Sequence, residues 1–224
     1  MRLPSLYIQH LHQHLRLGYP YFVISALLLL ALVAQANNKP TSLPVTSFYR
    51  NFQHLALINQ HSQPFNVADL QGKVVLFNFI YTQCSSVCSA QTIALAQLQN
   101  ALPGKVKQQV MFVSVSLDPL HDTPAQLKAF AQRANANMPG WQFLTGKPSA
   151  IAQLSDQLYL FDHPNKKTVL RPNDHATALW LVDAQGRLLM RYSGTPPDQA
   201  RLLREISQLS NIKPAKYRLT PSPQ

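Results

Sequence analysis

Two cysteines four positions apart, Cys84 and Cys88, are the residues best suited to chemistry, and they are the only cysteines in the chain. They follow a strongly apolar run at residues 74–81 and lead into a helical pattern at residues 88–102. The partial positive charge and free N–H groups of a helix N-terminus favour thiolate over thiol. The spacing places both sulfurs near one turn, so they could form a disulfide or hold one metal ion, and two thiolates suit Cu(I). Spacing alone leaves a structural disulfide equally open.

The elements around this pair predict an α/β domain. A hairpin is expected from residues 52–58 and 65–67, with further strands at 74–81, 110–117, 141–144, 176–182 and 188–192 and helices at 88–102, 123–134, 148–158 and 197–209. The early strand–helix–strand crossovers favour a parallel centre, and the late hairpin adds an antiparallel edge. We therefore predict a thioredoxin-like mixed sheet flanked by helices.

A histidine is the candidate third ligand. His175 lies just before the predicted strand at residues 176–182. In a thioredoxin-like sheet this junction faces the cysteine loop. Asp174 could orient the imidazole by hydrogen bonding, or could simply form an Asx turn.

The loop after the second buried strand holds further candidates. Asp118 and His121 lie in this loop, and Thr123 is expected to cap the next helix. The plain interpretation is a structural loop, but Asp118 should lie at the same end of the sheet as the cysteines. His121 is the best substitute metal ligand. Met111 and Met138 are expected to be core and loop residues, because the chain has no Met-x-Met cluster.

The N-terminal segment predicts a membrane anchor. Residues 21–34 are uncharged and apolar, and residues 18–20 extend them to about the minimum length for crossing a bilayer. Ala34-Gln35-Ala36 has the form of a signal-peptidase site, so cleavage after Ala36 is the alternative. We expect a cytoplasmic tail and anchor at residues 1–36, a linker at 37–50, the folded domain at 51–212 and a loose tail at 213–224. The anchor would sit in the inner membrane, with the domain in the periplasm.

Composition narrows the function further. With 46% hydrophobic residues the chain can build a real core, so wholesale disorder is excluded. Two cysteines exclude a disulfide-dense scaffold and a four-thiolate zinc site. The chain carries 20 basic and 9 acidic residues, but the basic ones are scattered, the longest run being Lys166-Lys167. We therefore expect no nucleic-acid partner, and instead a membrane surface or an acidic protein patch.

Several short motifs occur together in a characteristic order: Gly72-Lys73, Thr82-Gln83-Cys84 with Cys88, residues 113–119 (VSVSLDP), Asp122-Thr123-Pro124, residues 143–146 (FLTG), Asp174-His175, Leu181-Val182-Asp183 and Gly186. With these motifs the chain resembles the SCO/SenC copper-delivery proteins over most of residues 50–210. The resemblance implies a membrane-tethered thioredoxin-like domain that binds copper, as Cu(I) or Cu(II), through Cys84, Cys88 and His175. It also implies action on the dinuclear copper centre of cytochrome c oxidase.

The chain departs from the family pattern at three positions. Ser85 and Ser89 stand where the family commonly has proline, and Ala176 stands where a serine or threonine is usual. Proline removes an N–H group and stiffens a loop, so this loop should have more donors and a more adaptable turn.

Four functions remain open at this point. The main prediction is a monomeric, non-enzymatic chaperone that delivers copper to an oxidase subunit or another copper protein. The alternative is a thiol–disulfide reductase with Cys84 and Cys88 as its redox-active pair. A peroxiredoxin is disfavoured because no proline precedes Cys84 at the required spacing. A tethered adaptor with a structural disulfide is the simplest possibility.

Overall fold

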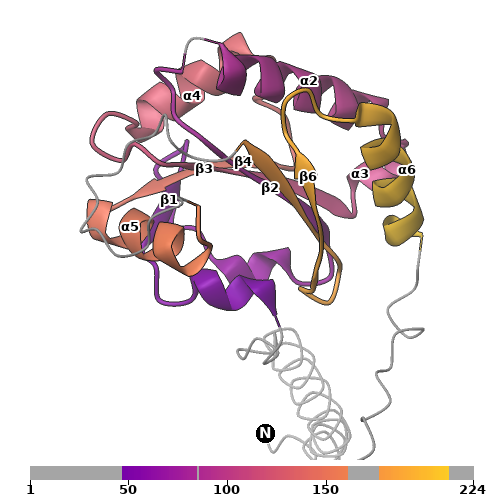
Figure 1. Cartoon of the computed structure of the whole chain (residues 1–224), viewed down its shortest axis with the longest axis horizontal. Helices are drawn as coiled ribbons and strands as arrows, with labels where there is room; N and C mark the ends of the chain where they lie inside the picture. The colour runs from indigo at the N-terminus through magenta and orange to yellow at the C-terminus, as the bar shows by residue number, and fades with distance from the viewer. Residues whose placement is uncertain (1–46, 85, 161–176, 212–224) are drawn as a thin grey trace, which may run out of the picture. The chain divides into compact units, whose positions relative to one another are not determined.

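A six-stranded mixed sheet crosses the domain, and the computed structural model describes it within residues 47–84, 86–160 and 177–211 (Figure 1). The strand order is β1-β4-β3-β2-β5-β6. The strands are β1 (Leu57–Asn59), β2 (Val74–Ile80), β3 (Val110–Ser116), β4 (Trp141–Gly146), β5 (Ala178–Val182) and β6 (Leu188–Ser193). β2, β3 and β4 run parallel, while β1, β5 and β6 join by antiparallel pairing. The predicted parallel centre and late antiparallel hairpin are confirmed.

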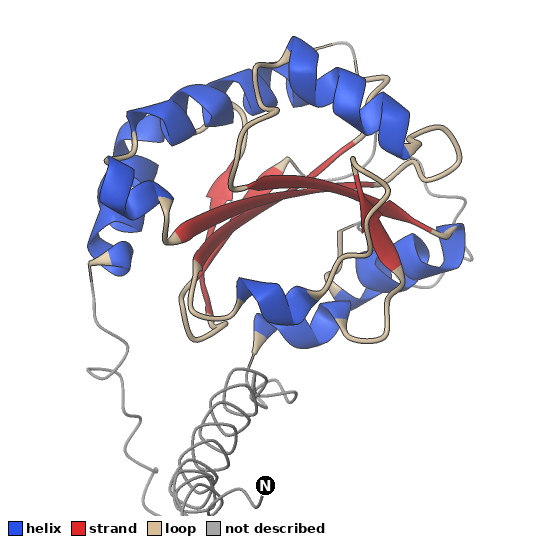
Figure 2. Ribbon diagram, turned by 180° about the vertical axis from the view of Figure 1, so that it is seen from behind, coloured by secondary structure: helices blue, strands red, loops and turns tan. Residues whose placement is uncertain are grey.

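Helices cover both faces of this sheet (Figure 2). One face carries α2 (Val87–Ala101), α3 (Gly104–Lys107), α4 (Pro124–Arg133) and α6 (Gln199–Ser210). The other face carries α5 (Pro148–Gln157) and two short 3-10 helices, η1 (Phe48–Phe52) and η2 (Val67–Leu70). The flanking helices match the predicted thioredoxin-like arrangement, except for α3 and the 3-10 helices, which the sequence pattern does not reveal.

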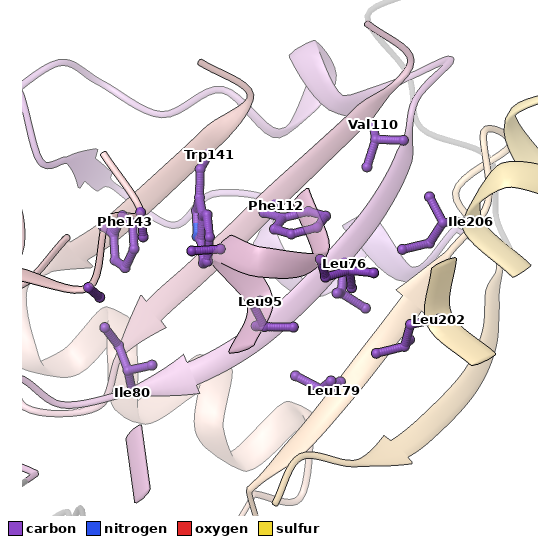
Figure 3. Close-up of a cluster of buried hydrophobic side chains, with 14 of the residues drawn as sticks. Leu76, Ile80, Leu95, Val110, Phe112, Trp141, Phe143, Leu179, Leu202 and Ile206 are labelled. Carbon is purple, nitrogen blue, oxygen red and sulfur yellow. The ribbon is translucent and has the colours of Figure 1, made fainter. Parts of the chain in front are cut away.

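The central strand β2 is buried along its whole length. Val74, Leu76 and Ile80 face the α2 side, while Val75, Phe77 and Phe79 face the other side. This explains why the strand reads as a continuous apolar run rather than an alternating one. Figure 3 shows the cluster on the α2 side, where side chains from the sheet meet Leu95 of α2 and Leu202 and Ile206 of α6. The cysteine loop therefore starts from a firmly packed strand end.

The predicted hairpin at residues 52–58 and 65–67 is confirmed only near its turn, where Ile58 forms an isolated antiparallel bridge with Pro64 and the Phe65 N–H group donates to the Leu57 carbonyl at 2.9 Å. Its first half is wrong. Phe52 ends η1, and its ring stacks on Phe77 at 5.0 Å between ring centroids, so this stretch packs on the sheet instead of extending. β1 has only three residues and pairs with β4, with Leu57 opposite Gly146. A Cβ atom at Gly146 would lie 2.8 Å from Leu57 Cδ2 and 3.0 Å from the Ala56 carbonyl oxygen, so glycine leaves room for the close approach of the two strands.

The end of the expected linker takes part in the packed core. Phe48 and Tyr49 are buried, and Ser47 accepts a hydrogen bond from the Tyr49 N–H group at 3.2 Å. The predicted anchor at residues 1–36 and the tail at 213–224 lie outside the described residues. Within the described ranges, no helix has the length and apolar character needed to cross a membrane.

Candidate metal centre at the cysteine loop

The two cysteines lie at the junction between β2 and α2. Cys84 is in the connecting loop, with its N–H group donating to the Tyr81 carbonyl at 3.2 Å, and Cys88 is in the first turn of α2. Both are free thiols, and Cys88 is only 2% exposed. The Cys88 N–H group donates to Cys84 Sγ at 3.3 Å. The Ser86 side chain makes no capping hydrogen bond, so the Cys84 sulfur takes part of that role at the helix N-terminus.

The two thiols differ in their readiness to ionise. Partial burial opposes ionisation of Cys84, but hydrogen bonds from Cys88, Tyr81 and Ser86 outweigh it and lower the pKa of the Cys84 thiol. Burial raises the pKa of the Cys88 thiol to about 12, and the neighbouring Cys84 and Asp122 charges act in the same direction. Cys84 is therefore the more accessible thiol and the one that ionises more readily, while Cys88 keeps its proton until a compensating charge, such as a metal ion, arrives.

Tyr81 belongs to the cysteine site, although the sequence analysis did not identify it as a site residue. Burial raises the pKa of its hydroxyl group to about 12, and its interaction with Cys84 adds to the rise. The protonated hydroxyl hydrogen-bonds with Cys84, which stabilises the thiolate. The sequence showed Tyr81 only as the end of an apolar run.

Asp122, which the sequence shows as part of the Asp122-Thr123-Pro124 motif, has a contact with the cysteine loop that the sequence does not reveal. Its carboxylate is fully buried and accepts hydrogen bonds from Thr82 N (3.1 Å), Thr82 Oγ1 (2.6 Å) and Ser116 Oγ (2.5 Å). Burial raises the pKa of this carboxyl group, despite those donors, and the Asp118 charge adds to the rise. Asp122 therefore joins the cysteine loop to the end of β3. The predicted cap of α4 is confirmed, since Thr123 Oγ1 accepts from Gln126 N at 3.3 Å.

Asp118 and His121 face each other beyond the end of β3. Both Asp118 carboxylate oxygens lie 2.9 Å from His121 Nδ1, and the Asp118 N–H group donates to Ser116 Oγ at 3.0 Å. The hydrogen-bonding partner of Asp118 is thus a histidine, not a cysteine. Within the described parts of the chain, no three His, Cys, Asp or Glu side chains gather closely enough to hold a metal ion.

The predicted third ligand His175, its neighbours Asp174 and Ala176, and Ser85 lie outside the described residues. Among the described residues, Leu179 near the start of β5 lies opposite Asn78, in the second half of β2. The chain therefore enters β5 at the end of the sheet where β2 leads to the cysteine loop.

The remaining candidates have plainer surroundings. Ser89, which stands where the family commonly has proline, donates its hydroxyl to the Cys84 carbonyl at 3.3 Å. Met111 and Met138 line a cavity of about 440 Å³ near the starts of β3 and β4, at the opposite end of the parallel strands from the cysteines. They therefore take no part in the cysteine site.

A dithiol at the start of the helix that follows a central strand, in a mixed sheet with helices on both faces, defines a thioredoxin-like dithiol protein. Residues 46–211 match the SCO1/SenC family model, and the chain belongs to this family. It is 30% identical over 164 residues to the SCO1 protein homolog of Bacillus subtilis, covering 69% of this chain and 80% of that protein.

Two solved structures extend the comparison. BsSco, a member of the Sco family of cytochrome c oxidase assembly proteins with a disulfide switch, is 28% identical, with a TM-score of 0.56 over 70% of this chain and 91% of that one. Bradyrhizobium japonicum ScoI with copper bound is 23% identical, with a TM-score of 0.57 over 68% and 95% of the two chains. At that identity, the second likeness supports the shared fold alone.

Proposed function

We propose that this chain is a copper chaperone that binds copper through Cys84, Cys88 and His175 and delivers it to the dinuclear copper centre of cytochrome c oxidase. The observation that carries the proposal is the pair of free thiols at the N-terminal end of α2, joined by the Cys88 N–H to Cys84 Sγ hydrogen bond. Two thiolates form a soft donor set that suits Cu(I). Family membership and the relatives' role in oxidase assembly support the same function.

The unequal thiols suit reversible binding of this cargo. Of the two thiols, the half-buried Cys84, with its lowered pKa, binds Cu(I) before Cys88 does. Binding at Cys88 then displaces a proton that burial otherwise retains, so the metal ion supplies the charge that stabilises a buried thiolate. A neutral imidazole from His175 would complete a three-coordinate site. Because Cys84 remains accessible, a recipient thiolate can replace it stepwise.

A thiol–disulfide reductase is the second candidate, favoured by the same accessible Cys84. Its thiolate would attack a partner disulfide, and Cys88 would then resolve the mixed disulfide. The partner gains two electrons as its disulfide becomes two thiols, and the Cys84–Cys88 pair is oxidised to a disulfide. A dithiol reductant would be needed to restore the pair. The disulfide switch of BsSco gives this alternative its weight.

The proposal includes a location. An anchor at residues 1–36 would hold the domain, as a monomer, on the periplasmic side of the inner membrane. Two of the 20 basic residues, Arg2 and Arg16, precede residue 37, which leaves 18 basic against 9 acidic residues on the exported part. That surplus favours an anionic membrane surface or an acidic patch on the recipient.

The direct test is an anaerobic Cu(I) titration of the reduced, full-length chain in detergent against a competing chelator. We expect one bound Cu(I), no competitive binding by the double Cys84→Ser, Cys88→Ser variant, and weaker binding by His175→Ala. His61→Ala, which changes an exposed histidine in the β1 turn, is the matched control and should bind normally. Absence of competitive copper binding, together with rapid reduction of a protein disulfide, would favour the reductase.

A further inference from the structure

The imidazole of His121 is an exposed nitrogen ligand on the loop between β3 and α4. Its side chain is 61% exposed, while that of its partner Asp118 is 15% exposed. Nδ1 lies 2.9 Å from both carboxylate oxygens of Asp118, and no described residue hydrogen-bonds to Nε2. A carboxylate that accepts from one ring nitrogen fixes the tautomer and leaves the other nitrogen as a lone-pair donor, which is the arrangement that metal-binding histidines use.

The backbone holds this pair in place. The Asp118 carbonyl accepts from His121 N at 3.2 Å and from Asp122 N at 2.8 Å, and the His121 carbonyl accepts from Thr123 N at 2.9 Å. Asp118 is itself fixed to the end of β3 by its bond to Ser116 Oγ. The His121 imidazole is therefore carried by a short hydrogen-bonded turn and not by a freely moving loop.

The same turn is fastened to the cysteine loop. Asp122 follows His121 in sequence, and its buried carboxylate accepts two hydrogen bonds from Thr82, which lies two residues before Cys84. The two loops leave neighbouring parallel strands at the same level, since Ile80 of β2 is paired with Ser116 of β3. His121 and Cys84 are thus on adjoining loops at one end of the sheet.

The position of His121 argues against a permanent ligand role. Its side chain does not join a group of three potential ligands among the described residues. An exposed imidazole also holds Cu(I) less firmly than a pair of thiolates, because thiolates are the softer donors. These properties suit a group that binds the metal ion briefly, before the ion moves to a site of higher affinity.

We propose that His121 Nε2 is a loading ligand, which binds incoming Cu(I) and passes it to Cys84. This inference rests on the proposed copper-binding function. In the transfer, a Cu–S bond to Cys84 forms as the Cu–N bond to His121 breaks, and any proton on the thiol leaves to solvent. Copper remains Cu(I), so no electrons are exchanged. Asp118 is a positioning residue, which keeps Nε2 as the free nitrogen.

Loading kinetics provide the main test. Cu(I) is delivered from a chelator complex to the reduced full-length chain in a stopped-flow instrument, and its equilibrium affinity is measured separately. We expect His121→Ala to slow loading about tenfold while changing the equilibrium affinity by less than about twofold. Asp118→Asn should slow loading in the same direction, and His61→Ala should load normally. Unchanged loading in His121→Ala, or an equal loss of affinity and rate, would overturn the proposal.

A second measurement does not depend on tight binding at the cysteines. The double Cys84→Ser, Cys88→Ser variant is labelled with ¹⁵N-histidine and titrated anaerobically with Cu(I). We expect the Nε2 resonance of His121 to shift and that of His61 to stay in place. If wild-type protein binds no copper competitively but this shift occurs, the proposed function fails and the His121 contact stands. If the His121 resonance does not move, the loading role is wrong whatever the cysteines do.

Discussion

Cys84, in the loop before α2, and Cys88, in the first turn of α2, lie close together but have different surroundings. Cys84 accepts hydrogen bonds that lower the pKa of its thiol, while burial raises the pKa of Cys88 to about 12. Reactivity follows the thiolate population and access. We predict that iodoacetamide modifies Cys84 at least about tenfold faster than Cys88 in the reduced protein at pH 7.5. Peptide mapping by mass spectrometry after a timed quench measures both rates. In urea the two rates should converge; equal rates in the native protein would contradict the prediction.

Tyr81 should affect the pKa of the Cys84 thiol. Its hydroxyl hydrogen-bonds with Cys84, and this bond is one of those that lower the pKa of the Cys84 thiol. Tyr81→Phe removes the donor, so the pKa of Cys84 should rise and its alkylation at pH 7 should slow about fivefold. The pH profile of the alkylation rate separates a pKa change from a loss of access. Tyr159→Phe is the control, since Tyr159 is 72% exposed, and its profile should match that of the wild type.

Residue-level prediction from the sequence succeeded where local pattern carries the information. The cysteines and the turn that holds them follow from a buried strand that meets a helical pattern. The roles of Asp122 and Tyr81 at the site could not be predicted, because they depend on which loops lie side by side in the fold. An aspartate after a strand is usually a turn or cap residue. Only the pairing of β2 with β3 reveals that Asp122 accepts from Thr82.

At the scale of elements, α2 is fixed to the sheet by buried polar groups as well as apolar ones. Asn78, in the second half of β2, donates to Gln91 Oε1 of α2 at 2.9 Å and accepts from Ser114 Oγ at 2.6 Å. Ser114 in turn accepts from Trp141 Nε1, and Gln91 donates to the Gly194 carbonyl. Hydrogen bonds are directional, so this network sets the position of the helix that carries Cys88.

Removing Asn78, at the centre of that hydrogen-bond network, should lower the stability of the fold. Asn78→Ala leaves donors and acceptors on Gln91 and Ser114 without partners in a buried site, and it opens a small cavity. We predict a loss of about 2–4 kcal/mol in the free energy of unfolding, measured by urea denaturation. Asn100→Ala changes an exposed residue of α2 and should cost less than about 0.5 kcal/mol. Equal stability of the two variants would show that apolar packing alone holds α2.

The junction between the cysteine loop and the β3–α4 loop should respond to pH. Burial raises the pKa of Asp122 above its unfolded value of about 3.9. The folded state therefore binds the Asp122 proton more tightly, and the resulting stabilisation is complete below about pH 3.9 and lost as pH rises through the folded pKa. We predict that the stability advantage of the wild type over Asp122→Asn shrinks as pH rises from about 4 to 7. Chemical denaturation at both pH values measures it; an advantage that grows with pH would refute the burial argument.

Element prediction failed where tertiary contacts override weak local signals. The buried strands and the longer helices follow from apolar patterns and from capping residues such as Thr123. β1 has only three residues, and it pairs with β4 where Gly146 leaves room for the Leu57 side chain. η1 is held by aromatic contacts, including Phe48 with Phe77 at 5.2 Å between ring centroids. Neither contact partner is close in sequence, so periodicity could not reveal them.

At the scale of the whole molecule, charge is the property that links the domain to its surroundings. Residues 37–224 carry 18 basic and 9 acidic residues, and the basic ones form no nucleic-acid-type cluster in sequence. A diffuse positive field accelerates encounter with an acidic partner without fixing a binding geometry. Such acceleration depends on the distance over which the charges act. This distance is set by the Debye length, which falls from about 30 Å at 0.01 M salt to about 3 Å at 1 M.

Copper transfer should therefore slow as salt rises. We predict that the second-order rate of Cu(I) transfer from the full-length chain to the copper-free oxidase subunit falls at least about tenfold between 0.01 M and 1 M salt. The equilibrium affinity of the chain for Cu(I) should change much less, because bonds to thiolates are local and short. Stopped-flow transfer measured alongside chelator competition separates the two effects. A transfer rate indifferent to salt would mean that shape and ligand exchange, not the positive surplus, bring the recipient to Cys84.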